Sequence, residues 1–240
     1  MLPVHQIQTS AADTLKKFRR LQGKQKIQFL WDYYKLPLAV LCIAVSLAAY
    51  SIYGHMTHKD TVLYTALVNV AAGEELMHNL TTAFMEAAGT DLSKNTCQLY
   101  TGLYLTDDPG SAYHAYTYAS RMKILAAINA RQIDLVLMDQ EAFDAFSQNG
   151  YLYETNLFIS EHTPLYETLE PYFAENTVIL EDNASAAIYH AQTETQVMGI
   201  DLSASPVIQK AGFSGTVYLG ILKNTAHKET VLEFLQYLYD

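Results

Sequence analysis

The sequence contains few residues whose types and spacing could bind a metal or form a known catalytic motif. The eight histidines form neither HExxH nor HxH, so we expect no zinc site. There is no GxSxG motif and no glycine loop of the kind that cradles phosphate. The turn Asp107-Asp108-Pro109-Gly110 lacks the alternating acidic ligands of a calcium loop, so we expect it to be a solvated turn. We therefore expect no enzyme, no cofactor and no metal site, with an extracellular hydrolase left open as an alternative.

The remaining candidates are polar residues at the carboxyl ends of predicted strands, where open α/β sheets bind their ligands. The candidate ligand-binding residues are Asn69, Tyr104, Asp139, Gln140 and Ser203. Tyrosines are dense around Tyr104, and their rings could stack on a sugar or a peptide. This group consists of Tyr100, Tyr104, Tyr113, Tyr116 and Tyr118. The alternative is that these rings cover the sheet and present their hydroxyl groups to water.

Strands that alternate with helices must position these residues. The predicted strands are 61–70, 97–105, 133–139, 177–180, 184–192 and 216–222. The predicted helices are 74–88, 111–130, 140–148, 163–174, 206–211 and 226–239. This alternation predicts an α/β domain with a mostly parallel sheet flanked by helices. In the second helix, the residues expected to face inward are Tyr118, Met122, Leu125 and Ile128.

One uncharged apolar run of eighteen residues, 36–53, precedes this domain. At about 1.5 Å per residue it reaches roughly 27 Å, close to the thickness of the hydrocarbon core of a bilayer. We expect a single transmembrane helix at 36–54, and hence the lipid bilayer as a partner. Two alternatives are a buried core helix and a cleavable signal peptide, since Ser46-Leu47-Ala48 resembles a small-x-small cleavage site.

Charge is distributed unevenly on the two sides of this run. Residues 1–35 contain seven basic and two acidic residues, a net charge of +5, whereas residues 60–240 contain seven basic and 23 acidic residues, a net charge of −16. The basic side predicts a cytoplasmic segment at 1–35 and an extracytoplasmic domain at 60–240 of a single-pass cell-membrane protein. The acidic domain has no clustered basic residues for nucleic acid. The two cysteines, Cys42 and Cys97, are too far apart in this arrangement to form a disulfide.

Three stretches resemble known proteins. KQKIQFLWDYYKLP resembles a segment that precedes the membrane helix in single-pass proteins of clostridial-type bacteria. KILAAINARQIDLVLMDQEAFDAFSQNGYLYE and GTVYLGILKNTAHKETVLEFLQYL resemble two portions of extracellular solute-binding proteins. This resemblance implies a type II periplasmic-binding-protein-like fold. Only about 60 residues separate the two portions, so a whole second lobe is not expected. We expect 156–212 to form a small excursion, with 133–139 and 216–222 in one sheet.

These observations lead to two hypotheses about function. The first is a membrane-anchored extracytoplasmic binding domain of the solute-binding-protein type that binds a small solute. The second is a structural or regulatory ectodomain that binds a neighbouring membrane protein and no small molecule.

Overall fold

The computed structural model describes residues 23–57, 59–181 and 192–240. The chain divides into two compact units, Met1–His58 and Lys59–Asp240. The predicted segment 1–35 lies outside the described residues except for Gly23 and the helical backbone that follows it. In the predicted anchor 36–54, the side chain of Leu38 also lies outside the described part of the chain.

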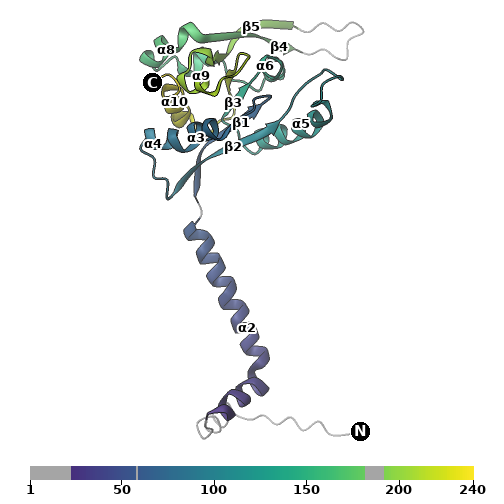
Figure 1. Ribbon diagram of the computed structural model, residues 1–240, viewed down its shortest axis with the longest axis vertical. Helices are drawn as coiled ribbons and strands as arrows, with labels where there is room; N and C mark the ends of the chain where they lie inside the picture. Colours follow the sequence, from purple (N-terminus) through teal and green to yellow (C-terminus); the bar gives the residue numbers. More distant parts are fainter. Residues whose placement is uncertain (1–22, 58, 182–191) are drawn as a thin grey trace. The chain divides into compact units, whose positions relative to one another are not determined.

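The first unit contains the long helix α2, Lys24–Thr57 (Figure 1). Its large apolar side chains are exposed to a similar extent along the predicted run, for example Val40 at 63%, Val45 at 60% and Leu47 at 64%. Among the side chains that the structure describes, no helix contains an 18-residue window apolar enough to cross a membrane.

The second unit is built on one six-stranded sheet with the order β2-β1-β3-β6-β5-β4. The strands are β1 (Asp60–Val68), β2 (Asn95–Leu103), β3 (Leu135–Met138), β4 (Phe173–Glu181), β5 (Gln192–Asp201) and β6 (Tyr218–Ile221). β1 is parallel to both β2 and β3, whereas the other three pairings are antiparallel. The prediction of a mostly parallel sheet is therefore wrong, and the sheet is mixed. The expected pairing of segments 133–139 and 216–222 in one sheet is confirmed, because β3 and β6 are neighbours.

Short helices cover both faces of this sheet (Figure 1). They are α3 (Glu74–His78), the π-helical turn η1 (Asn79–Ala83), α4 (Phe84–Ala87), α5 (His114–Asn129), α6 (Gln140–Gln148), α7 (Thr155–Ile159), α8 (Thr163–Leu169), η2 (Glu170–Tyr172), η3 (Leu202–Ala204), α9 (Pro206–Ala211) and α10 (Lys228–Tyr237). The helices α3, α4 and α10 pack in one hydrophobic cluster, and α5 and α6 pack in another.

Successive residues of a strand point to opposite faces, and the two clusters follow this alternation. In β3, Leu135 and Leu137 belong to the cluster of α3, α4 and α10. The intervening Val136, with Met138, belongs to the cluster of α5 and α6. Both clusters consist of residues after Lys59, so we expect Lys59–Asp240 to fold without the preceding segment.

The excursion 156–212 adds β4 and β5 to the edge of this sheet and packs on the existing core. Its buried residues Ile159, Leu169 and Ile208 belong to the cluster of α10, as expected for an excursion without a core of its own. The predicted strand 184–192 lies outside the described residues apart from Gln192. The strand that pairs with β4 is β5, which the sequence pattern did not indicate.

Helix α5 is rotated relative to the prediction. The side chains that it buries are Thr117, Ser120, Ile124 and Ala127, two of which are polar. Tyr118 is instead 76% exposed and Met122 is 52% exposed, so the expected inward face is wrong at these positions, whereas Ile128 packs against the core as expected. The reason is that backbone N–H groups in the loop after β2 need hydrogen-bond acceptors, which polar side chains of α5 provide. Thr106 N donates to Thr117 Oγ1 (3.2 Å), and Tyr104 N donates to Ser120 Oγ (3.0 Å).

Candidate site at the carboxyl ends of the parallel strands

Asn69 and Asp139, predicted from separate strand ends, lie together in the structure. Asn69 follows β1 with a φ of 58°, a left-handed conformation that asparagine tolerates better than most residues. Its Nδ2 donates to Asp139 Oδ1 (3.0 Å) and to Leu105 O (2.6 Å), and its Oδ1 accepts from Leu105 N (2.9 Å). The side chain of Asn69 thus joins the chain segments that follow β1, β2 and β3.

Asp139 also begins α6. Its Oδ1 accepts from Ala142 N (2.9 Å), a helix N-cap that satisfies one of the free N–H groups of the first turn. The chain leaves β1 toward the face covered by α3 and leaves β3 toward the face covered by α6. Asn69 and Asp139 therefore lie at a topological switch point, where ligands bind in open α/β sheets. In the structure their hydrogen bonds hold the loops in place.

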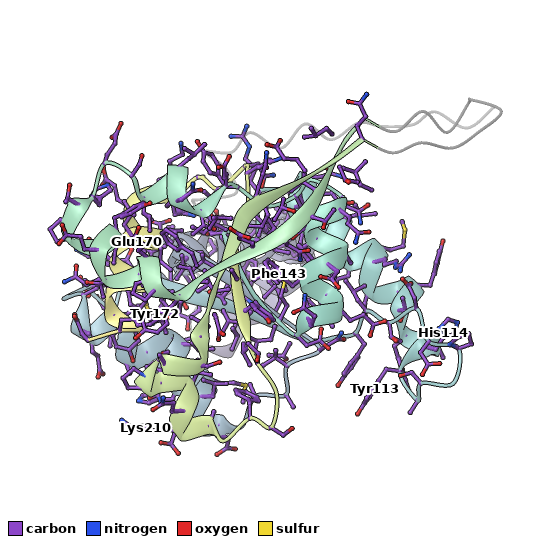
Figure 2. All side chains as sticks on the ribbon, turned by 90° about the horizontal axis from the view of Figure 1, so that it is seen from above. Tyr113, His114, Phe143, Glu170, Tyr172 and Lys210 are labelled. Atoms are coloured by element: carbon purple, nitrogen blue, oxygen red, sulfur yellow. The ribbon has the colours of Figure 1, made fainter. Side chains whose placement is uncertain are left out.

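Tyr104 lies at the same edge of the sheet and forms an aromatic cluster with two tyrosines of the following segment. The Tyr104 and Tyr113 rings stack at 4.2 Å and are nearly parallel, and Tyr116 lies 6.3 Å from Tyr104. Tyr113 is 50% exposed and Tyr116 is 60% exposed, so these rings project from the surface rather than cover the sheet. Figure 2 shows Tyr113 at one end of the domain.

Gln140 and Ser203 take part in separate local networks. Gln140 Nε2 donates to Asp144 Oδ1 (2.7 Å), which also accepts from Asn176 Nδ2 of β4 (2.9 Å). Ser203 follows β5, and its hydroxyl donates to the carboxylate of Asp201. Because β6 lies between β3 and β5, the structure does not bring Ser203 to Asp139.

Tyr218 of β6 lies close to these two networks. Burial raises the pKa of its hydroxyl, and the carboxylates of Asp201 and Asp144 raise it further. Its ring stacks on Phe143 of α6 at 4.7 Å. Tyr218 is therefore an uncharged hydrogen-bonding group at neutral pH, in an environment that opposes negative charge.

An open pocket of about 400 Å³ lies between α5 and α6, and its lining includes Leu105 and Asp107 of the segment after β2. Leu105, Ile124 and Phe146 line it with almost fully buried apolar side chains. Polar groups also line it. Arg121 Nη2 donates to Asp107 Oδ1 (2.7 Å), and Asp107 N donates to Glu141 Oε1 (2.7 Å). The five predicted site residues do not line this pocket, because the sequence pattern could not show how α5 and α6 pack.

Sequence reasoning missed the S-x-x-K spacing formed by Ser120 and Lys123, which resembles a serine acyl-transfer motif. Ser120 is buried and its Oγ accepts from Tyr104 N, while Lys123 Nζ lies over the Tyr100 ring, 5.9 Å from its centroid. In the described part of the chain no hydrogen bond joins Ser120 to Lys123. The motif therefore packs α5 on β2 and does not form a nucleophile–base pair.

Sequence reasoning also missed a buried carboxylate at the opposite edge of the sheet. Asp134 is fully buried, and its two oxygens accept from Tyr64 N (2.9 Å), Thr225 Oγ1 (2.6 Å) and His227 Nδ1 (2.9 Å). The aspartate lies inside an apolar stretch, and its partners are 70 or more residues away, so no local signal marks it. This network joins β1, β3 and the turn before α10, which indicates a structural role.

The described residues contain no group of three or more His, Cys, Asp or Glu that could hold a metal ion. Burial raises the pKa of the Cys97 thiol to about 12, so the thiol stays protonated at neutral pH and is a poor nucleophile. No family model, curated protein or solved structure matches this chain.

Proposed function

We propose that the chain is a single-pass membrane protein whose extracytoplasmic domain binds a small solute in the pocket between α5 and α6. This proposal rests mainly on the pocket. Its volume of about 400 Å³ is in the range of small-molecule sites, and it combines apolar walls with a few polar groups. Leu105 and Asp107, which follow β2, line it, so it reaches the carboxyl end of one parallel strand, the usual binding edge of such sheets. The resemblance to solute-binding proteins supports the same function.

The shape of the pocket limits the ligand. In this single unit the pocket is open, so it surrounds a ligand less completely than a cleft between two closing lobes. The Arg121–Asp107 pair offers a donor and an acceptor beside the apolar residues Ile124 and Phe146. A small molecule with an apolar part and a polar end suits these groups best.

Ligand binding is tested by thermal shift on residues 59–240 with a panel of sugars, amino acids, short peptides and metal ions. A ligand at 100 times its Kd stabilises the folded domain by about 2.7 kcal/mol. Ala145→Phe fills the pocket and is expected to abolish the shift. Ala126→Phe places the same ring at an exposed position outside the pocket and should leave the shift intact. Equal shifts in the two variants would exclude this pocket as the site.

The membrane anchor is supported by the apolar run and the basic residues before it. Exposed apolar side chains along α2, such as Val40 and Leu47, need an apolar environment, which a bilayer provides. The excess of Lys and Arg before Leu36 favours a cytoplasmic N-terminus.

Protease added to intact cells is expected to digest the chain after Lys59 and to spare the portion before Lys35. Protection of the C-terminal portion would contradict this orientation. A soluble fragment that begins near Ala49 would show that the run is a cleaved signal peptide instead.

The alternative function, an ectodomain that binds a neighbouring membrane protein, is favoured by a different feature. Tyr118 and Met122 of α5 are large, exposed and next to each other on the helix surface. Retention of the domain by a protein partner, together with no thermal shift for any solute, would favour this function over solute binding.

A further inference from the structure

A stripe of three large apolar side chains and one arginine runs along the exposed side of α5. It consists of Tyr118, Arg121, Met122 and Leu125, which lie three or four positions apart and therefore share one side of the helix. Tyr118 is 76% exposed and Met122 is 52% exposed, and Tyr116 and Tyr113 extend the apolar surface toward the start of the helix. Apolar groups gathered in this way on a surface mark an interaction site. We call these four residues the α5 stripe.

The charge of α5 indicates what kind of surface it would bind. The helix contains Arg121 and Lys123 but no acidic residue, although residues 60–240 contain 23 acidic and only seven basic residues. Arg121 pairs with Asp107, but both side chains are exposed, and a surface ion pair of this kind is weak. An acidic surface with apolar residues would complement the α5 stripe.

This chain presents such a surface on α10. Glu229, Glu233 and Asp240 are exposed and spaced by four and seven residues along α10 and the residues that follow it. Hollows of about 680 and 630 Å³ adjoin them, and both are lined by Glu233 and Gln236. Apolar residues such as Leu165, Leu232 and Val207 also line these hollows. Among the described residues that line the two hollows, Lys210 is the only lysine or arginine. We call Glu229, Glu233 and Asp240, with the hollows beside them, the α10 surface.

The α5 stripe and the α10 surface cannot meet within one molecule. Helix α5 packs on one face of the sheet and α10 on the other. They lie at opposite ends of the domain in Figure 1, and Figure 2 shows His114 of α5 far from Lys210, which lines a hollow of the α10 surface. Contact between two α5 stripes is unfavourable because it would bring Arg121 and Lys123 close to the same residues of the other copy.

We propose that copies of this chain associate head to tail, with the α5 stripe of one copy docked on the α10 surface of the next. Such a heterologous contact leaves one free surface at each end, so it continues into a ring or a row of copies. Charge complementarity directs the contact, and the tyrosine and methionine side chains fill the hollows. Association does not require a solute in the α5–α6 pocket, but Arg121 and Leu125 of the stripe also line that pocket, so a docked copy would compete with a bound solute there.

Two variants of the full chain, studied in detergent by analytical ultracentrifugation, test this assembly. The stripe variant combines Tyr118→Ser with Met122→Ser, and the acidic variant combines Glu229→Lys with Glu233→Lys. The wild-type mass should rise with concentration beyond that of a dimer. Each variant alone is expected to weaken association at least about tenfold, which corresponds to about 1.4 kcal/mol. A control variant combines Leu157→Ser with Leu180→Ser, two exposed apolar positions elsewhere, and should associate like the wild type.

A mixture of the two variants tests directly whether the contact is head to tail. The stripe variant retains its α10 surface and the acidic variant retains its α5 stripe, so the mixture should form one-to-one heterodimers and nothing larger. A monomeric wild type, full association of either variant alone, or a mixture without heterodimers would each overturn the proposal. Association through α2 would persist in every variant and is thereby distinguished from the head-to-tail contact.

Discussion

Replacing Asp134 by Ala is expected to lower the free energy of unfolding of residues 59–240 by about 3–5 kcal/mol. The substitution removes the acceptor for Tyr64 N, Thr225 Oγ1 and His227 Nδ1, all within 2.9 Å of the carboxylate. Thr225 is buried, so its hydroxyl would lose its acceptor at a place that water reaches poorly. Equilibrium unfolding in urea measures the change.

Asp107→Ala is the matched control. Asp107 also accepts a hydrogen bond from a basic side chain, that of Arg121 at 2.7 Å, but its own side chain is 86% exposed. The loss of a surface ion pair is expected to change stability by about 1 kcal/mol or less. If Asp134→Ala were no more destabilising than Asp107→Ala, the structural role of the buried network between β1, β3 and the turn before α10 would be contradicted.

Four of the strands could be predicted because their apolar residues pack on the faces of the sheet. The predicted segments 61–70 and 97–105 overlap β1 and β2, and the predicted segments 133–139 and 216–222 contain β3 and β6. The apolar spacing in α6 and α10 also indicates which side of each helix packs on the sheet, since Phe143, Phe146, Phe234 and Leu235 are buried. In these elements apolar burial alone decides which side faces the core.

Prediction failed where polar contacts or long-range pairing decide the structure. α5 turns Thr117 and Ser120 inward because their hydroxyls accept hydrogen bonds from the loop after β2. An apolar pattern favours the opposite rotation, with Tyr118 and Met122 inside. β5 begins with the polar residues Gln192–Thr195, exposed on the outer part of the hairpin, so its apolar pattern is weak. Its pairing with β4 and β6 holds it in the sheet.

The candidate site could be predicted only in part for the same reason. Asn69 and Asp139 follow parallel neighbouring strands, so the rule for strand ends was enough to bring them together. Ser203 follows β5, whose place in the sheet depends on the antiparallel return through β6. The pocket between α5 and α6 depends on how two helices pack on one face, which the rule for strand ends does not describe.

Replacing Gly199 by Val is expected to destabilise residues 59–240 by about 3 kcal/mol, because the core has no room for a side chain there. A Cβ at this position of β5 would lie 2.7 Å from Leu219 O and 3.0 Å from Phe143 Cε2. The neighbouring strand β6 cannot give way without loss of its pairing with β5. Gly215→Val provides the control, since no atom lies within 4 Å of a Cβ built there. Similar unfolding free energies for the two variants would contradict the close packing of β5.

The same substitution should also disturb the proposed binding pocket. The Phe143 ring lies 3.0 Å from a Cβ built at Gly199, so a side chain at position 199 pushes on α6, which also contributes Ala145 and Phe146 to the pocket. A double-mutant cycle with Phe143→Leu separates the two contacts. If the Phe143 ring carries much of the clash, Gly199→Val should destabilise the Phe143→Leu protein less than the wild type, by at least about 0.5 kcal/mol. If the two substitutions had strictly additive effects on the unfolding free energy, the whole cost of Gly199→Val would come from the clash with Leu219 O. In that case the change in β5 would not affect α6 or the pocket.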